Sequence, residues 1–448
     1  MTTRRKFLKS STMLAAGLGI SPLLSSASPS PATQKKEEVV NGRVNIAVIG
    51  VGMGCRDLQG ALTDNPWVHC VGMCDVNKVR LDEQIARFKA DYPEQTASVK
   101  AYNDFREVLA NKDIDGVIIA TPDHWHPYIF VEALKAGKAI YVEKPVANSI
   151  SECNVMMDVQ KKYRGIVTTG LWQTSQRYFK AANEILKSGV LGDVYKVQLW
   201  LCQSTNPRPG VADSSAPSTL DYNMWLGPAP ERPFNNSRFR GWRGFWDYGG
   251  GQQTDWGVHW IDSAFDGLKA LGLCDREYPE AVFSTAYKDP TSFNETPSCQ
   301  TSIFQYKNFH IEWAQQVAYL YNRNQGVAWV GSKATLVCNR DGYELIPEKT
   351  REGILLTDRA QLIGKFEDGG VEAHATNWCK CILNKSTATN SPIEKGVFAT
   401  ILAHMANISY LTGTRVAYDP NARKFVNNPK ADAYLKKVYR EPWRFPEI

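Results

Sequence analysis

VNIAVIGVGMG, at residues 44–54, is the stretch that decides the fold of the N-terminal part of this chain. Its first six residues form a short apolar run, which is typical of a β-strand buried on both faces. A glycine turn follows at once, then a helical stretch from Arg56, and then a second apolar run at 68–74 that leads into Asp75. This order of strand, glycine turn, helix, strand and acid is typical of a dinucleotide-binding unit.

Each part of this unit has a physical role in holding a dinucleotide. Gly50 permits the tight turn, and Gly52 lets the backbone approach a pyrophosphate that rests on the helix N-terminus. Asp75 can accept hydrogen bonds from the ribose hydroxyls and repels a 2′-phosphate, so we expect NAD rather than NADP. The usual third glycine position holds Cys55, and Gly54 comes one residue early, which leaves the local turn geometry open. We assign all three glycines and Asp75 to cofactor binding.

Strands and helices continue to alternate after this unit. Further helical and apolar stretches lie at 105–111, 115–120, 127–137 and 139–142. This alternation predicts an α/β fold with a doubly wound parallel sheet. Thr121 and Pro122 follow one of its strands, and Glu143 and Lys144 follow another. Because ligands bind beyond the carboxyl ends of such strands, we expect these four residues to line the cofactor crevice.

The second half of the chain has a different pattern. After a strand at 166–172, polar and apolar residues alternate in several segments, at 195–200, 281–287, 300–306, 310–316 and 334–339. Alternation of this kind predicts a large, mostly antiparallel open sheet. We therefore expect a dinucleotide-binding domain over 43–165 and an α/β domain for substrate binding and oligomerisation over 166–448.

The N-terminus has the pattern of a targeting signal rather than of a folded element. Basic residues at 3–9, an apolar stretch at 13–24 and small residues at 25–27 follow in the order of a secretory signal, and Arg4-Arg5 looks like a twin-arginine address. We predict a signal over 1–27, a flexible arm over 28–42, and an exported, periplasmic protein.

Charge and hydropathy exclude some partners. The whole chain carries a net charge of +6, but four basic residues and no acidic one lie in the predicted signal, so the rest is close to neutral. This removes the charge argument for a nucleic-acid or anionic-membrane partner. No run of 18 apolar residues exists, so we expect no transmembrane segment.

Three motifs give the chain a family resemblance. They are TPDHWH at 121–126, Glu143-Lys144-Pro145, and a glycine triplet at 249–251 that leads to DWGVH at 255–259. Together, over 44 to about 420, they resemble the Gfo/Idh/MocA oxidoreductases. The resemblance implies a Rossmann domain, an α/β domain with an open sheet, and a homodimer or homotetramer. The Asp-His-Trp-His version is similar to an exported bacterial branch related to glycoside 3-dehydrogenases and to glycosidases that use bound NAD in a redox cycle.

The resemblance also implies the catalytic residues, which are Lys144, Asp255 and His259. Oxidation of a secondary alcohol needs a base beside the hydroxyl and a cation for the growing alkoxide charge. We assign His259 as the proton acceptor, Asp255 as its orienter or a substrate ligand, and Lys144 as the group that polarises the oxygen. Asp255 and His259 are spaced i, i+4, which on a helix places them on one face. Whether His259 or Lys144 takes the proton stays open.

Other candidate residues are less specific. The resemblance places His124 and His126 near the nicotinamide and its ribose. His-x-His can also bind a metal, but no further ligand cluster accompanies the pair, so we expect no metal. A last group of residues is assigned to substrate contacts: Gln173, Arg177, Tyr178, Trp242 and His374. Trp242 belongs to a tryptophan-rich stretch whose flat rings suit the C–H faces of sugars, although such rings serve protein cores equally well.

Four functions remain in view. The first is oxidation of a ring hydroxyl of a sugar or glycoside, at carbon 3, by an enzyme whose NAD is tightly bound because it is loaded before export. The second is a redox glycosidase that oxidises, eliminates, adds water and re-reduces, with net hydrolysis. The third is a non-catalytic NAD-binding or sensor module, and the fourth is a zinc hydrolase. The expected partner is a small carbohydrate.

Overall fold

The computed structural model describes most of the chain, over residues 42–52, 65–93, 99–202, 209–316, 320–363 and 370–446. The predicted signal, all but the last residue of the predicted arm, and Gly54 lie outside these described residues. Everything described belongs to one compact unit.

The first sheet is parallel throughout and has six strands in the order β3-β2-β1-β4-β5-β6. Its strands are β1 (Val44–Ile49), β2 (Val68–Cys74), β3 (Lys100–Tyr102), β4 (Gly116–Ile119), β5 (Ala139–Val142) and β6 (Val167–Thr169). β4 and β5 are buried at every position, which explains their unbroken apolar sequences. The expected doubly wound parallel sheet is confirmed.

Helices cover both faces of this sheet. They are α2 (Lys78–Asp91), α3 (Phe105–Ala110), α4 (His126–Lys135), α5 (Ile150–Tyr163) and, from far along the chain, α11 (Gly370–Leu383). Trp378 of α11 packs in one apolar cluster with Val44, Ile46 and Val48 of β1. A helix from the last part of the sequence therefore completes the dinucleotide-binding half.

β6 corrects one expectation. The strand at 166–172 was expected to begin the second domain, but β6 pairs in parallel with β5 and forms the edge of the first sheet.

The second sheet has eight strands in the order β14-β13-β12-β11-β7-β10-β9-β8. Its strands are β7 (Val194–Cys202), β8 (Ala281–Tyr287), β9 (Cys299–Gln305), β10 (His310–Gln316), β11 (Gln325–Gly331), β12 (Ala334–Asn339), β13 (Gly342–Pro347) and β14 (Ala360–Ile363). All neighbours are antiparallel except β7 and β10. The expected mostly antiparallel sheet is confirmed.

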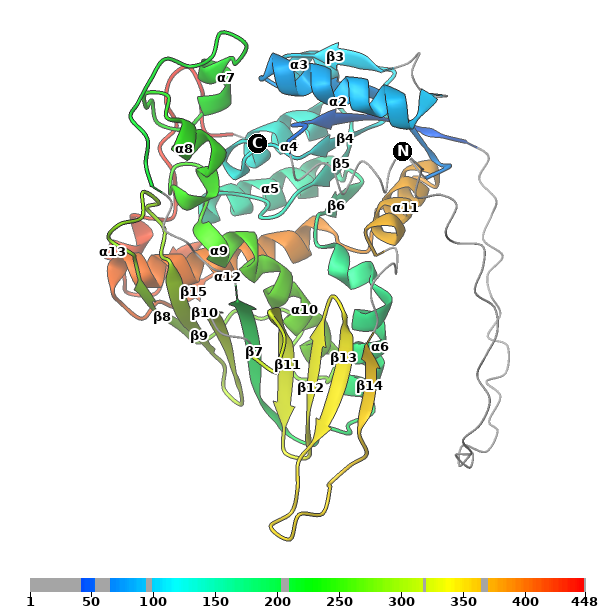
Figure 1. Cartoon of the computed structure of the whole chain (residues 1–448), viewed down its shortest axis with the longest axis vertical. Helices are drawn as coiled ribbons and strands as arrows, with labels where there is room; N and C mark the ends of the chain where they lie inside the picture. The colour runs from blue at the N-terminus through cyan, green and yellow to red at the C-terminus, as the bar shows by residue number, and fades with distance from the viewer. Residues whose placement is uncertain are drawn as a thin grey trace. The chain divides into compact units, whose positions relative to one another are not determined.

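Helices α6 (Arg177–Lys187), α10 (Gly257–Ala270) and α12 (Ile393–Thr412) cover one face of the second sheet. α12 packs against α5 on one side and against α10 and β8 on the other, so it lies between the two halves (Figure 1). It is buried almost all round because both halves contact it.

The remaining elements are short. They are η3 (Asp123–Trp125), η4 (Trp172–Ser175), α7 (Tyr222–Leu226), α8 (Asn236–Arg240), η5 (Trp242–Gly244), α9 (Gly251–Asp255), β15 (Tyr418–Asp419), β16 (Lys424–Phe425) and α13 (Pro429–Asp432). No helix in the described part of the chain combines the length and apolarity needed to cross a bilayer.

Residues 209–250, which we call the cover segment, return from the second half to the first. The Lys78 amide donates to the Thr219 carbonyl at 2.9 Å, and the Asp221 amide donates to the Val76 carbonyl at 3.0 Å. Trp225, on α7, belongs to the segment's own apolar cluster. The cover segment is therefore folded against the end of β2, where the predicted cofactor site begins.

Residues 436–446 lie across the cover segment and hold it. Arg440 donates to the carbonyl oxygens of Gly227 and Asn223, at 2.8 and 2.7 Å. Lys437 donates to the Trp246 carbonyl at 2.8 Å, and Trp443 packs edge-on against the ring of Trp125. These contacts fasten the cover segment to the dinucleotide-binding half.

Candidate active site

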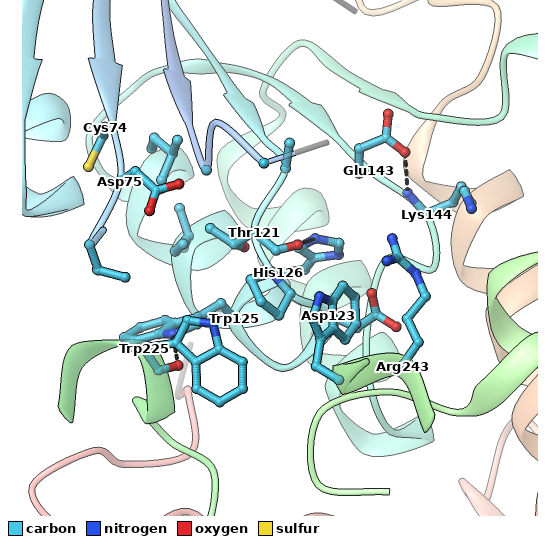
Figure 2. A pocket seen from close by; sticks show the side chains of 18 of the residues that line it. Cys74, Asp75, Thr121, Asp123, Trp125, His126, Glu143, Lys144, Trp225 and Arg243 are labelled. Carbon is cyan, nitrogen blue, oxygen red and sulfur yellow. Dashed lines mark hydrogen bonds between the residues drawn. The ribbon is translucent and has the colours of Figure 1, made fainter. Parts of the chain in front are cut away.

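A cavity of about 900 Å³ lies at the carboxyl ends of the parallel strands. Its lining contains most of the residues assigned from sequence: Gly50, Gly52, Asp75, Thr121, Pro122, His126, Glu143, Lys144, Trp242, Asp255 and His259. The loops after β1, β2, β4 and β5 form one wall of the cavity. The cover segment, α9 and α10 form the rest of its lining. Figure 2 shows this wall, with Asp75 and Lys144 at opposite ends of the view.

The glycine turn after β1 is shaped for a close backbone approach. Gly50 has φ of +90°, and a Cβ added there would lie 2.7 Å from the backbone of Ala120 and Thr121. Only glycine tolerates both conditions. The turn therefore keeps open the space that a dinucleotide would use, and the residues present fit that cofactor.

Asp75 lies where β2 ends. Its carboxyl accepts hydrogen bonds from the amides of Val51 at 3.1 Å and Asn77 at 2.8 Å. Burial raises the pKa of Asp75, and these amides and Arg80 oppose the rise. The carboxyl is thus fixed in place at the cavity lining, as an acceptor for ribose hydroxyls requires.

His126 joins the loops that follow β4 and β5. Its Nδ1 lies 2.8 Å from the Pro145 carbonyl oxygen, and its Nε2 lies 2.8 Å from the Thr121 carbonyl oxygen. Burial lowers the pKa of His126 to about 4, so the ring is neutral and donates to one of the two carbonyls. The ring sets the spacing of the two loops that carry Thr121 and Lys144.

Lys144 and Asp255 form the centre of the site. The Lys144 ammonium donates to Oδ1 of Asp255 at 2.7 Å and to its backbone carbonyl at 2.8 Å. Arg243 Nε lies 3.2 Å from the same Oδ1. Burial raises the pKa of Asp255, but Arg243 and Lys144 outweigh it and bring that pKa to about 2. Asp255 is therefore ionised and holds two cations at the cavity.

His259 reaches the cavity from α10. It is buried, and its ring faces the rings of Trp172 and Trp256 at centroid distances of 6.4 and 6.3 Å. Burial, and then Lys144 and Arg340, lower the pKa of His259 well below its usual range. The lowered pKa keeps the imidazole neutral. Its Nδ1 has no hydrogen-bond partner within the described chain.

Two expectations about Asp255 and His259 need correction. α9 ends at Asp255 and α10 begins at Gly257, so the pair does not share one continuous helix. The Asp255 carboxylate is directed to Lys144 and Arg243, and within the described residues it makes no hydrogen bond to His259. Its assigned role as orienter of His259 therefore has no support in the geometry.

Five assigned residues lie outside the lining of this cavity: His124, Arg177, Tyr178, His374 and Gln173. His124 is buried with Nε2 3.1 Å from the Trp225 carbonyl oxygen. Arg177 and Tyr178 bond to each other on α6, at 3.1 Å. His374 is fully buried and bonds to Ser175 and to the Thr169 carbonyl at 2.8 and 2.9 Å, which is a structural role in place of the expected substrate contact.

Gln173 acts on the cavity indirectly. Its Oε1 accepts two hydrogen bonds from Arg340, at 3.1 and 3.0 Å. The Arg340 guanidinium lies 4.6 and 4.8 Å from the ring centroids of Trp172 and Trp256, and all three line the cavity. Gln173 therefore positions a residue that faces the ligand space.

Sequence reasoning missed several lining residues, among them Asp123, Arg243 and Arg340. Asp123 lies inside the quoted TPDHWH motif, and Arg243 follows Trp242 directly, so local signals existed for both. Arg340 comes from the turn between β12 and β13, and nothing near it in the sequence points to the site.

Comparison with known proteins gives the family. A family model described as an oxidoreductase family with an NAD-binding Rossmann fold (GFO_IDH_MocA) matches residues 44–171, and the model of its C-terminal α/β domain matches residues 180–277. An alpha-N-acetylgalactosaminidase of Tannerella forsythia is 28% identical over 202 residues, 43% of each protein. An inositol 2-dehydrogenase of Salmonella paratyphi B is 26% identical over 147 residues, 32% of this chain and 42% of the relative. Each match spans less than half of the relative's length.

Solved structures share the fold. A levoglucosan dehydrogenase in complex with NADH and levoglucosan superposes with a TM-score of 0.61 at 16% identity, covering 84% of this chain and 99% of that one. An aldose-aldose oxidoreductase of Caulobacter crescentus, complexed with glycerol, gives 0.61 at 17% identity with the same coverage. At these identities the likeness establishes the fold alone.

Proposed function

Because the chain belongs to the Gfo/Idh/MocA oxidoreductase family, we propose that it is an NAD-dependent enzyme that oxidises a ring hydroxyl of a sugar or glycoside, at carbon 3. The observation that carries this proposal is the meeting of Lys144, Asp255 and His259 in one cavity with the glycine turn at Gly50. A cofactor turn, a fixed cation and a neutral base are the parts that alcohol oxidation needs.

The chemistry divides between these side chains. A bound nicotinamide supplies the hydride acceptor. The Lys144 ammonium has three donors, of which Asp255 takes two, so one remains to polarise the substrate oxygen. His259 takes the hydroxyl proton at Nε2, because Nδ1 is buried and the ring is neutral.

Asp75 supports NAD over NADP. A fixed carboxyl at the end of β2 accepts from both ribose hydroxyls and disfavours a 2′-phosphate. The cover segment supports tight retention of the cofactor. Trp225, Phe239 and Trp242 of that segment line the cavity, so a bound dinucleotide would lie beneath it. Export by the twin-arginine route and assembly into a homodimer or homotetramer stay predictions from the sequence.

A redox glycosidase is the second candidate, favoured by the match to an alpha-N-acetylgalactosaminidase and to several glycosyl hydrolase family 109 proteins at 28% identity. Oxidation at carbon 3 acidifies the neighbouring C–H, which permits elimination of the aglycone, addition of water and return of the hydride. Burial raises the pKa of Glu143 in the cavity to about 6, so this carboxyl is suited to the proton transfers of these reaction steps near neutral pH.

One preparation of the protein tests these candidates together. Mass spectrometry of the small molecules released on denaturation reads out bound NAD, and metal analysis of the same sample tests the zinc hydrolase. A panel of methyl and nitrophenyl glycosides is then assayed for keto-sugar and for free aglycone. Keto-sugar supports the dehydrogenase, and aglycone without net NADH supports the glycosidase. Bound NAD with neither product indicates a non-catalytic module, and absence of any nicotinamide binding overturns the proposal.

A further inference from the structure

Asp123 is a buried acid that the chemistry above leaves unused. It belongs to η3, in the loop after β4, and only 1% of its surface is exposed. It lines the cavity, yet neither of its carboxyl oxygens has a hydrogen-bond partner in the described parts of the chain. Figure 2 shows its carboxyl turned toward the Arg243 side of the site.

The charges around Asp123 are already committed. Arg243 and Lys144 face it from the cover segment and from the loop after β5, and Asp255 and Glu143 add negative charge. Both cations pair with Asp255, at 2.7 Å for Lys144 and 3.2 Å for Arg243. Three carboxyl groups thus surround two cations. Asp255 is bonded to both, and the Glu143 carboxyl accepts from the Lys144 backbone amide at 3.2 Å, whereas neither Asp123 oxygen has a bonded partner among the described residues.

A buried carboxylate without a bonded partner is unfavourable by several kcal/mol, so such a group takes up a proton instead. In agreement, burial raises the pKa of Asp123 well above its ordinary value, and Asp255 and Glu143 oppose the lowering effect of Arg243 and Lys144. A protonated carboxyl carries an O–H donor, and this one meets no acceptor from the residues that the structure describes.

Gly249 packs closely against this carboxyl. A Cβ added to Gly249 would lie 3.2 Å from Oδ2 of Asp123 and 3.2 Å from Cα of Arg243. A side chain at Gly249 would therefore crowd the space next to the acid.

We propose that Asp123 is held as a neutral carboxylic acid that donates a hydrogen bond to a second oxygen of the bound sugar, next to the oxygen that Lys144 polarises. This inference rests on the proposed sugar oxidation. It assigns the substrate class as a sugar with a hydroxyl adjacent to the reacting one, because Asp123 and Lys144 line the same part of the cavity. Asp123 is then a specificity-determining residue.

The first experiment needs no substrate. Infrared spectra of the holoprotein at pH 7 are recorded for the wild type, Asp123→Asn and Glu143→Gln, and each variant is compared with the wild type. The carbonyl stretch of an undissociated carboxyl is expected in the wild type, absent in Asp123→Asn and retained at least in part in Glu143→Gln. An Asp123→Asn spectrum identical to the wild type in this region overturns the neutral acid.

The second experiment tests the contact with the sugar. Methyl β-D-glucoside and its 2-deoxy and 4-deoxy analogues are compared in the wild type, Asp123→Asn and Asp123→Ala. Asparagine keeps a neutral donor of the same shape, so it keeps most of kcat/KM, whereas alanine leaves the sugar oxygen unpaired and lowers kcat/KM by about 10- to 100-fold. In the wild type, kcat/KM for one of the two deoxy analogues is lower than for the parent glucoside by a similar factor. In Asp123→Ala, loss of that hydroxyl lowers kcat/KM no further.

pH dependence gives a signature that a structural role would not produce. Wild-type kcat/KM falls as pH rises through deprotonation of Asp123, and Asp123→Asn lacks this fall. Equal deoxy penalties in wild type and Asp123→Ala overturn the contact while leaving the oxidation intact. A wild type that produces neither keto-sugar nor methanol from the glucoside and the wider glycoside panel overturns the proposed function itself, and the infrared result stands apart from that outcome.

Discussion

The Lys144 ammonium lies 2.7 Å from the Asp255 carboxylate, although 111 residues of chain separate the two. One follows a strand of the parallel sheet, and the other ends the short helix α9 that leads to His259. The ion pair therefore ties the dinucleotide-binding half to the substrate side of the cavity. It also fixes the direction in which the ammonium points.

Replacing this lysine tests the proposed chemistry. Lys144→Met removes the charge and keeps the aliphatic stem, so we expect kcat to fall by about 10²- to 10⁴-fold while NAD stays bound. Product formation is measured by keto-sugar or aglycone release, and bound NAD by absorbance after denaturation. Lys78→Met, at an exposed pair with Asp82, is the matched control and keeps full activity. Unchanged kcat in Lys144→Met would contradict the assigned role.

Asp255 makes stability depend on pH in the acid range. Its pKa is about 2 in the folded protein and near 3.9 in an unfolded chain, so the contribution is complete above pH 4 and is lost as pH falls toward 2. The shift corresponds to about 2–3 kcal/mol. Urea unfolding of the wild type between pH 5 and pH 2.5 should therefore lose stability more steeply than Asp255→Asn does. Asp82→Asn, at the exposed pair, serves as the control, and equal slopes for wild type and Asp255→Asn would refute this assignment.

We expect Asp75 to favour NAD over NADP. Asp75→Ser removes the carboxyl that accepts from the ribose hydroxyls and disfavours a 2′-phosphate, so NAD should bind about 10- to 100-fold more weakly and NADP should bind more tightly. Titration calorimetry on apoprotein measures both affinities. Asp75→Asn keeps the shape and the Asn77 contact and controls for folding. A variant that still prefers NAD by the wild-type ratio speaks against Asp75 as the discriminating residue.

Two glycine substitutions separate the role of the cover segment from general strain. Gly227 has φ of +50°, and a Cβ there would overlap Cζ2 and Cε2 of Trp125, whereas Gly272 has φ of +70° with nothing within 4 Å of an added Cβ. Gly227→Ala should therefore lift the segment and release NAD during gel filtration, while Gly272→Ala strains only its own turn and keeps the cofactor. Equal retention in both variants would show that the cover segment does not hold the cofactor.

A buried ion cluster stabilises the substrate side of the protein. Arg276 donates to Asp262 at 2.9 Å and to Asp266 at 2.5 Å, and Lys395 donates to Asp266 at 2.8 Å. Arg276→Met leaves Lys395 as the remaining cation for the buried carboxylates of Asp262 and Asp266, so the free energy of unfolding should fall by about 3–5 kcal/mol. The exposed pair of Lys269 with Asp275 provides the control. Lys269→Met should change the free energy of unfolding by less than about 1 kcal/mol. Denaturant melts of both variants decide whether burial makes the difference.

Local patterns predicted the parts of the fold that local physics determines. β1, β2, β4 and β5 are continuous apolar runs because helices cover both of their faces, and their order along the chain was readable. β11 escaped prediction because its central residues are buried on both sides and show no alternation. The partner of β6, and the packing of Trp378 against β1, depend on contacts between distant segments that no window of sequence contains.

The site divides in the same way. Lys144 and His259 were found because each lies in a motif that occurs at a strand end or helix start. Arg340 was missed because its place depends on the register of β12 with β13. His374 was assigned to substrate contacts, but Ser175 and the Thr169 carbonyl already satisfy its ring nitrogens inside the protein.

Residues 437–443, which fasten the cover segment over the cavity, are synthesised late. Arg440 and Lys437 bond the cover segment to the rest of the protein, and Trp443 packs beneath it on Trp125. A ribosome makes these residues after every element that they fasten. Until they emerge, the cover segment is held by fewer bonds, so we expect a dinucleotide to enter the cavity more easily before these residues dock than after.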